Sequence, residues 1–345
     1  MDKNAETTMK HRDEDRGQEA SEIHPIALDK STVGHRPKTH DPATHIRGLS
    51  ALDLNVPVFS FLAAPGDLYQ IPAAIKALVL DFDGTTMKFD YTEGMRQKAY
   101  RRAIQSMSIE ALGRKLTRSE VVACHNPAIN KPEEEMAEVI ATGLSKILGK
   151  TIHGGDLFAR WLEQCEHLRT HIAQRYGRPP HSAIVKGISS LMSEANARGI
   201  PVSICTAGAH QFVEPLLKAG GLMSQLNHSG NVFVNRHPGM PTKPHADPYL
   251  LACKKLGLDP SQILVAEDSA TGALAALRAG ARVILQPSGN REQTLRSLLW
   301  QIKHEHPDWV HSRPGAITVL YRDRGWTQVQ FPAQPQTQTG APPAP

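Results

Sequence analysis

The sequence is poor in the features that mark several large protein classes. Only 4 of its 345 residues are cysteines, they lie far apart, and none forms a Cys-x-x-Cys pair. This spacing argues against a disulfide framework and against a cysteine-based metal site. No apolar run is long enough to cross a membrane, and no apolar segment of the secretory type stands at the N-terminus. We therefore expect a reducing, cytoplasmic location.

A concentrated charge of either sign is also missing. Lys and Arg number 39 against 34 Asp and Glu, which gives a net charge of +5. The small excess is scattered, with no basic block and no aromatic residues interleaved with basic ones. We therefore expect neither nucleic acid nor a membrane as a partner. What is present, 40% apolar and 21% charged residues, is typical of a soluble globular protein.

Composition divides the chain into three parts. Residues 1–48 are polar, contain scattered histidines and are nearly free of aromatics. Such a segment cannot bury enough apolar surface to offset the entropy of ordering, so we expect disorder there. The Pro-, Gln- and Thr-rich end, 323–345, is predicted to be a second disordered tail. The ordered protein is expected between these two segments.

Between the tails, short β-rich runs alternate with helical patterns. Continuous apolar strands that alternate with helices argue for a parallel sheet covered on both faces, so the predicted fold class is α/β with a Rossmann-like core. We expect this core to be discontinuous, formed by residues 49–91 and 185–322. Ligands collect at the carboxyl ends of the strands in such sheets. The strands are predicted at 75–81, 200–206, 231–234, 263–267 and 282–285.

Residues 92–184 differ from the core because they show helical patterns and no convincing strand. In NKPEEEMAEVIATGLSKILGK, apolar residues recur on one helical face, Pro132 and three glutamates occupy the first turn, and Gly149 follows the last. We interpret 92–184 as an all-helical cap domain inserted after the first core strand, above its carboxyl end. A cap in this position can exclude water from a site beneath it.

The stretch ALVLDFDGTT, residues 77–86, ends an apolar run with two carboxylates, Asp81 and Asp83. One interpretation is a strand that ends in an ordinary Asp-Gly turn. The other is chemical: one carboxylate can attack phosphorus and form an aspartyl phosphate, and the second can protonate the leaving oxygen and later take a proton from water. Two adjacent anions facing an anionic substrate require a divalent cation, and hard oxygen ligands favour Mg²⁺.

Groups that would complete such a site stand at other predicted strand ends or just before helices. Glu267 and Asp268, in ILVAEDSATG, offer further acidic ligands. Lys243, in PTKPHADPYLLA, offers a cation, and Thr206, in VSICTAGA, offers a hydroxyl. Each also has an ordinary structural interpretation, as a helix cap, an exposed lysine or a β-branched strand residue. Taken together and in this order, they favour the chemical interpretation.

On these motifs the sequence resembles the haloacid dehalogenase superfamily over residues 75–290. DFDGT is similar to its first motif, SICTAG to its second, TKPHADPY to the region of its third and VAEDSATG to its fourth. The resemblance implies a small phosphorylated substrate, with Asp81 as the nucleophile and Asp83 as the general acid and base. It also implies that the phosphoryl group is bound by Thr206, Ala207 and Lys243, and Mg²⁺ by the Asp81 carboxylate, the Asp83 backbone carbonyl and Asp268, with Glu267 in support.

Within the superfamily, the EDS form of the fourth motif and the proline-flanked lysine are most similar to the phosphoglucomutase-like and sugar-phosphatase branch. Dehalogenases and phosphonate hydrolases similar to this fold lack the second aspartate, so Asp83 favours phosphate-ester chemistry. One departure stands at the entry to the cap. Relatives commonly carry an acidic residue four places after the first-motif glycine, where this chain has Lys88, with Asp90 two places on.

The cap is expected to select the substrate, although its sequence gives few signals. Basic residues cluster in its first helix, and Arg96 and Arg101 are candidates to contact a second anionic group. A solvated helix face is the alternative interpretation of this cluster. Outside the family core, AITVLYRDRGWTQVQF, residues 316–331, is predicted to form a hairpin with an Asp-Arg-Gly turn.

Three functions fit this pattern. The first is a Mg²⁺-dependent phosphatase that hydrolyses a small phosphorylated metabolite through an aspartyl phosphate. The second is a phosphoglucomutase-like phosphosugar isomerase, which uses the same intermediate and excludes water better. The third is a non-catalytic binding or regulatory protein on the same fold, whose tails contact a partner. The oligomeric state stays open.

Overall fold

The computed structural model describes residues 56–333, apart from 63, 65, 129–130, 178–179 and 322–324. The predicted disordered segment 1–48 and the part of the predicted tail beyond residue 333 lie outside the described residues. Among the helices that are described, none is both long and apolar enough to cross a membrane.

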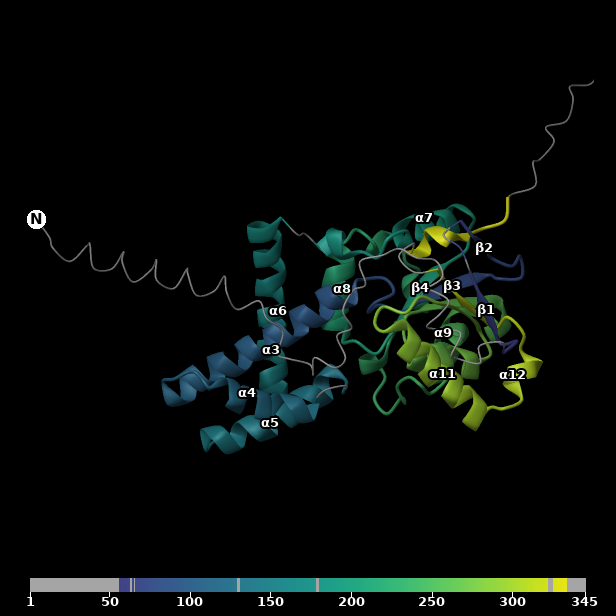
Figure 1. The fold of residues 1–345 in the computed structure, drawn as a ribbon. Helices are drawn as coiled ribbons and strands as arrows, with labels where there is room; N and C mark the ends of the chain where they lie inside the picture. Colours follow the sequence, from purple (N-terminus) through teal and green to yellow (C-terminus); the bar gives the residue numbers. More distant parts are fainter. Residues whose placement is uncertain are drawn as a thin grey trace, which may run out of the picture. The chain divides into compact units, whose positions relative to one another are not determined.

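The centre of the fold is a seven-stranded sheet in which all neighbouring strands are parallel (Figure 1). In sheet order its strands are β1 (Phe59–Phe61), β8 (Ile317–Val319), β7 (Arg282–Leu285), β6 (Ile263–Glu267), β3 (Ala77–Leu80), β4 (Val202–Thr206) and β5 (Val232–Phe233). The strand that carries the first motif, β3, therefore lies between β6 and β4. A separate small sheet pairs β2 (Tyr69–Gln70) with β9 (Val329–Gln330), also in parallel.

Helices cover both faces of the main sheet, as the sequence predicts. Side chains alternate along a strand, so in β3 Leu78 and Leu80 pack into one apolar cluster whereas Ala77 and Val79 pack into the other. The first cluster includes residues of α7 (Ile188–Ala197) and α8 (His210–Ala219); the second includes residues of α9 (Asp247–Leu256), α10 (Ala270–Ala279) and α11 (Arg291–Glu305), which α12 (Trp309–Ser312) follows. The predicted α/β, Rossmann-like fold class is confirmed.

An all-helical cap follows β3. Its helices are α3 (Phe89–Leu112), α4 (Arg118–His125), α5 (Glu133–Leu148) and α6 (Gly154–Tyr176) (Figure 1). Thr117 and Glu120 form a reciprocal capping box at the start of α4. Tyr100 of α3 stacks on Trp161 of α6, with ring centroids 5.0 Å apart. The first cap helix begins at Phe89, slightly before the predicted boundary at residue 92.

The predicted hairpin over residues 316–331 is wrong. β8 lies between β7 and β1 in the main sheet, whereas β9 pairs with β2, so the two strands do not pair with each other. Apolar alternation indicates an extended segment, but it does not say which strand becomes its partner. The predicted tail also begins too early, because Trp326 and Phe331 are buried. Strands from both ends of the described chain thus complete the core.

The packing of α10 against the sheet leads to a stability prediction. Leu274 is fully buried in the second cluster, and Leu250 of α9 is exposed. Leu274→Ala should lower the free energy of unfolding by about 2–5 kcal/mol, because the truncation leaves a cavity. Leu250→Ala, the matched control, should change it by less than about 0.5 kcal/mol. Denaturant unfolding followed by circular dichroism measures both, and equal losses would contradict the described packing.

Candidate active site

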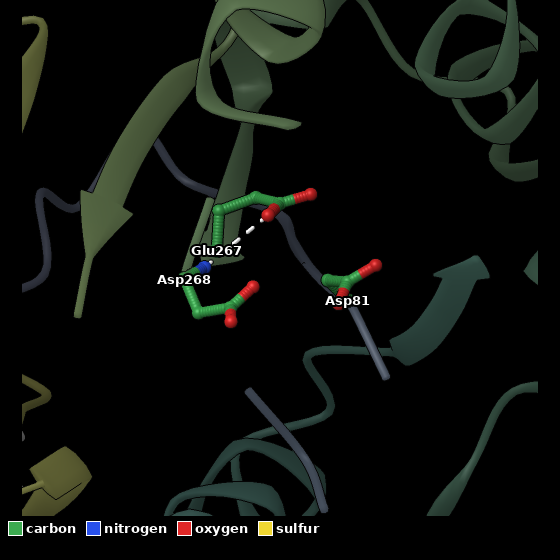
Figure 2. Close-up of side chains that lie close together, drawn as sticks. All are labelled: Asp81, Glu267 and Asp268. Carbon is green, nitrogen blue, oxygen red and sulfur yellow. Dashed lines mark hydrogen bonds between the residues drawn. The ribbon is translucent and has the colours of Figure 1, made fainter. Parts of the chain in front are cut away.

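Three acidic side chains meet at the carboxyl ends of two neighbouring strands. Asp81 directly follows β3, Glu267 is the last residue of β6, and Asp268 comes next. Because β3 and β6 are paired along their length, their ends lie side by side. One carboxylate oxygen from each residue lies within 4.8 Å of the others, and all three residues are buried (Figure 2). The structure thus brings together three of the residues that the sequence singles out.

Lys243 reaches this acidic cluster from the loop before α9. Its Nζ donates to Asp81 Oδ1 at 2.6 Å, to Glu267 Oε1 at 2.6 Å and to the backbone carbonyl of Cys205 at 3.0 Å. Cys205 lies in β4, one residue before Thr206. A single ammonium group is therefore bound at the ends of three adjacent strands, β4, β3 and β6.

Glu267 is held from several sides. Its Oε1 accepts a second hydrogen bond from Tyr249 OH at 2.6 Å. Its Oε2 accepts from the backbone N–H of Asp268 at 3.2 Å and from the hydroxyl of Ser269 at 3.1 Å. The dashed line in Figure 2 marks the bond to Asp268. Because both oxygens of Glu267 are engaged, its clearest role in this arrangement is to orient Lys243.

The charges of this cluster are not balanced by the protein itself. Three carboxylates face the single ammonium of Lys243. Burial raises the pKa of Asp81 to about 7, against the opposing effect of Lys243, and burial together with Asp81 raises the pKa of Asp268 well above its usual value. Burial alone would lower the pKa of Lys243, but Asp81 and Glu267 raise it overall, so the lysine stays charged. The cluster is short of positive charge.

The donor set fits a hard divalent cation. Asp81 and Asp268 present carboxylate oxygens close together, and oxygen ligands of this kind suit Mg²⁺. Ser288 donates to Asp268 and orients it. Gly84 has a φ of 79°, and a Cβ there would lie 1.9 Å from Asp268 Oδ2, so the first motif needs its glycine at this point.

Asp83 is held by the cap. Both of its carboxylate oxygens accept hydrogen bonds from Arg96 of α3, at 2.7 and 2.8 Å. Arg96 Nε donates to Glu133 Oε1 at 2.9 Å, and Glu133 Oε2 accepts from the backbone N–H of Ala209 at 3.1 Å. The guanidinium also lies over the Phe212 ring, 4.4 Å from its centroid. This network joins α3 and α5 of the cap to the first motif and to the loop after β4.

The two cap candidates have different surroundings. Arg96 is buried, so the solvated-face interpretation is wrong for this residue, and its guanidinium binds Asp83 and Glu133. Burial alone would lower the pKa of Arg96, but these two carboxylates raise it overall. Arg101 is half-buried. Its charge lowers the pKa of His125, although burial of the histidine is the larger cause of that decrease.

The second motif lies at the same sheet edge as the acidic cluster. Thr206 ends β4, which is paired with β3, and its side chain is buried. Its Oγ1 accepts from the backbone N–H of Gly208 at 3.0 Å, which shapes the turn after the strand. Ala207 lies in that turn and is half-buried.

Three groups at this site were not among the sequence candidates: Tyr249, Ser288 and Glu133. Tyr249 stands in the first turn of α9, six residues after Lys243. Its closeness to Lys243 in the sequence could have identified it as part of the site. Ser288 follows β7, and Glu133 begins α5. These two reach the site only through tertiary packing, which has no local pattern in the sequence.

Comparisons with known proteins bear on the same region. The family model for haloacid dehalogenase-like hydrolases matches residues 75–280, more than half of the chain. Hexitol phosphatase A of Escherichia coli is 37% identical over 98 residues, which are 28% of this chain and 43% of that protein. A phosphoglycolate phosphatase of Thiobacillus denitrificans is 27% identical over 240 residues, 66% of this chain and 91% of that protein. The chain thus spans less than half of the first relative and most of the second.

Solved structures similar to this chain include CbbY from Rhodobacter sphaeroides in complex with phosphate, at 22% identity and a TM-score of 0.45, covering 64% of this chain and 90% of that one. A β-phosphoglucomutase from Clostridium difficile is 16% identical with a TM-score of 0.46, covering 65% and 88%. The family match includes Asp81, Lys243 and Asp268 and ends before β7. It confirms the resemblance seen in the motifs: the chain belongs to the haloacid dehalogenase-like hydrolase family.

Proposed function

We propose that the protein is a Mg²⁺-dependent phosphatase that hydrolyses a small phosphorylated metabolite through an aspartyl-phosphate intermediate. The observation that carries this proposal is the buried cluster of three carboxylates at adjacent strand ends, in which a single lysine pairs with two of them, Asp81 and Glu267. Buried anions without enough cations destabilise a protein, so the cluster is suited to binding a divalent cation. The names of the two curated relatives, a hexitol phosphatase and a phosphoglycolate phosphatase, support a small phosphorylated substrate.

Asp81 is the proposed nucleophile. Its carboxylate is held at Oδ1 by Lys243, and its backbone carbonyl accepts from Thr86 Oγ1 at 2.6 Å, so the group is fixed at the end of β3. Attack of a carboxylate oxygen on phosphorus would form the aspartyl phosphate and break the bond to the leaving oxygen. Lys243 and Thr206, with the turn at Ala207, would bind oxygens of the transferring group.

Asp83 is the proposed acid and base. It would protonate the leaving oxygen and then take a proton from the water that hydrolyses the aspartyl phosphate. Because Arg96 binds both of its oxygens, the loss of one of these bonds would free an oxygen of Asp83 to approach a substrate. A movement of the cap would release it, since Arg96 belongs to α3 and Asp83 to the loop after β3.

The metal ligands would be the carboxylates of Asp81 and Asp268 and the backbone carbonyl of Asp83. Glu267 would support them by holding Lys243 in place. When bound, Mg²⁺ would supply positive charge for the phosphoryl oxygens and polarise the group under attack.

The first prediction from this proposal tests the nucleophile. Asp81→Asn should lower Mg²⁺-dependent phosphate release by about 10³-fold or more, because the amide cannot form the acyl phosphate. Release is measured on a panel of phosphorylated metabolites and a generic aryl phosphate, with Mg²⁺ and with a chelator. The best compound of the panel would also name the substrate class.

Asp156→Asn is the matched control, because Asp156 is an exposed aspartate in the first turn of α6. This variant should keep the parent's rate within about twofold, as expected for a surface change. Release that survives in Asp81→Asn would mean that Asp81 is not the nucleophile. No release from any compound by the folded parent would contradict the phosphatase and direct the next assays to phosphosugar isomerisation and to partner binding.

The second prediction tests the metal site without an activity assay. Mg²⁺ at 100 times its Kd should stabilise the parent by about 2.7 kcal/mol, which appears as a higher Tm than in chelator. Asp268→Asn should lose most of this shift, because it removes a charged ligand from the cluster, whereas Asp156→Asn should keep it. Equal shifts in all three proteins would place the bound Mg²⁺ elsewhere.

The third prediction concerns pH in the absence of metal. Because the pKa of Asp81 is raised from 3.8 to about 7, the folded protein keeps a proton between these values that the unfolded chain loses. The folded state then binds more protons, so stability falls as pH rises through this range. Asp268, with its raised pKa, acts in the same direction.

Denaturant unfolding in chelator at pH 5 and pH 7.5 measures this fall. Asp81→Asn should show a smaller fall than the parent, since it lacks the titrating carboxyl. Saturating Mg²⁺ should also reduce the fall in the parent, because a cation favours the ionised carboxylates. An identical pH dependence in parent and variant would contradict the assigned pKa shift.

A further inference from the structure

A segment beyond the family match contacts both connections between core and cap. We call residues 325–331 the C-terminal segment; it contains a 3₁₀ turn, Gly325–Gln328, and β9. Neither this segment nor β2, with which β9 pairs, lies within the matched residues 75–280. Its contacts therefore belong to a part of the chain to which the family model assigns nothing.

Every covalent link between core and cap passes through two connections. The first, residues 85–88, leads from the first motif into α3, and the second, residues 183–187, leads from the cap to α7. A movement of the cap therefore has to change backbone angles in one or both of them. The two run side by side, joined by backbone hydrogen bonds from Lys88 N–H to the Ala183 carbonyl at 2.8 Å and from Val185 N–H to the Thr86 carbonyl at 3.0 Å.

Trp326 is bonded to both connections. Its indole Nε1 donates to the Thr85 carbonyl at 3.0 Å, and its backbone N–H donates to the Lys186 carbonyl at 3.0 Å. The residue is 1% exposed, so water does not compete for these bonds in the folded state. A single residue thus ties the first connection to the second.

Two glycines allow this close approach. Gly187 has a φ of 86°, and a Cβ there would lie 2.5 Å from the backbone nitrogen of Thr327. Gly325 has a φ of 65°, and a Cβ there would lie 2.5 Å from the Lys186 carbonyl oxygen. Both positions combine a left-handed backbone with contact against another backbone, which other residues tolerate poorly. The contact between the second connection and the C-terminal segment is therefore specific to these backbones.

The C-terminal segment is in turn fixed to the core. β9 pairs with β2, and the Ile71 N–H donates to the Gln330 carbonyl at 2.8 Å. Arg198, just after α7, donates from Nη1 to the Pro332 carbonyl at 2.7 Å and lies over the Phe331 ring. These partners precede β3 or follow α7, so they belong to the core. Trp326 therefore holds the Thr85 and Lys186 carbonyls to the core and not to the cap.

The first connection begins within the first motif. Thr85 lies two residues after Asp83, and the next residue, Thr86, donates from Oγ1 to the Asp81 carbonyl. The position of the Thr85 carbonyl thus bears on the loop that carries both aspartates.

We propose that Trp326 is a positioning residue for the cap hinge. It holds the Thr85 and Lys186 carbonyls to the core. The backbone rotation that moves the cap therefore occurs only within residues 86–88 and 183–185. Trp326 reaches the two aspartates only through Thr85 and touches no substrate. The inference concerns the movement of the cap and does not rest on the phosphatase reaction.

The test compares Trp326→Phe with Trp300→Phe by amide hydrogen exchange. Phenylalanine keeps an aromatic ring and the backbone N–H at position 326 but removes the indole donor to Thr85. Trp300, on α11, is 59% exposed and serves as the matched control. In Trp326→Phe the amides of Lys88 and Val185 should exchange at least tenfold faster, while those of β3 stay within twofold of the parent. Trp300→Phe should change neither set.

These outcomes separate a hinge role from a purely structural one. A general loss of stability would speed exchange in β3 as well as in the connections, and this result would overturn the proposal. Unchanged exchange in both connections would also overturn it. If the parent is active, kcat of Trp326→Phe should fall at least fivefold with KM changed less. An inactive parent would contradict the proposed function and leave the exchange test of Trp326 intact.

The parent alone gives a second measurement if Trp326→Phe does not fold. The indole N–H of Trp326 should exchange with solvent at least 100-fold more slowly than that of Trp300, measured by NMR on assigned indole resonances. Equal exchange rates would show that the bond from Trp326 to Thr85 does not persist in solution, and the proposal would fall.

Discussion

The structure of the site depends on one buried ammonium group. Lys243 is bonded to Asp81, to Glu267 and to the backbone of β4, so its position requires the ends of three strands to lie side by side. Removing it would leave buried carboxylates without a cation, a change that typically costs several kcal/mol. The parallel sheet meets this requirement because its strands all end at the same edge. The parallel sheet that forms the core therefore also places the charged groups of the site.

A second cation, Arg96, belongs to the cap and binds the other aspartate of the first motif. Lys243 fixes Asp81 within the core, whereas Arg96 fixes Asp83 from the cap. The carboxylate of Asp81 is thus bound by a core residue, whereas that of Asp83 is bound by a residue of the cap. Glu133, also in the cap, binds Arg96 and the backbone N–H of Ala209 after the second motif, so the cap contacts both motifs. In the proposed reaction the nucleophile is always in place, and the acid is available only when the contacts of Arg96 change.

The sequence was sufficient for features with a local cause. Every residue of β3, β4 and β6 is buried because both faces of those strands are covered, so the strands show up in the sequence as short, mostly apolar runs with polar residues at or just after their ends. Which strands pair with one another was not predictable in this way. β8 and β9 look like a hairpin in sequence, yet each pairs with a strand from near residue 60 or 70. The Arg96–Asp83 pair was missed for a related reason, because it forms only when α3 packs over the first motif.

Two kinds of contact govern how the cap is attached to the core: the bonds of Trp326 to the two connections, and the bonds of Arg96 to Asp83. Under the proposed hinge, the connections would keep their bonds to Trp326 whatever lies in the site, because those bonds join buried donors of Trp326 to uncharged backbone carbonyls. The bonds of Arg96 to Asp83 are charge-assisted and strong, but an ionised ligand can compete for either partner. In the proposed reaction, the phosphoryl group of the substrate would bring negative charge close to Asp81 and Asp83, where it could compete with Asp83 for Arg96. The contact that would open is then the Arg96–Asp83 pair, since the substrate can replace Asp83 as the anionic partner of Arg96. The hinge would stay attached to the core through Trp326.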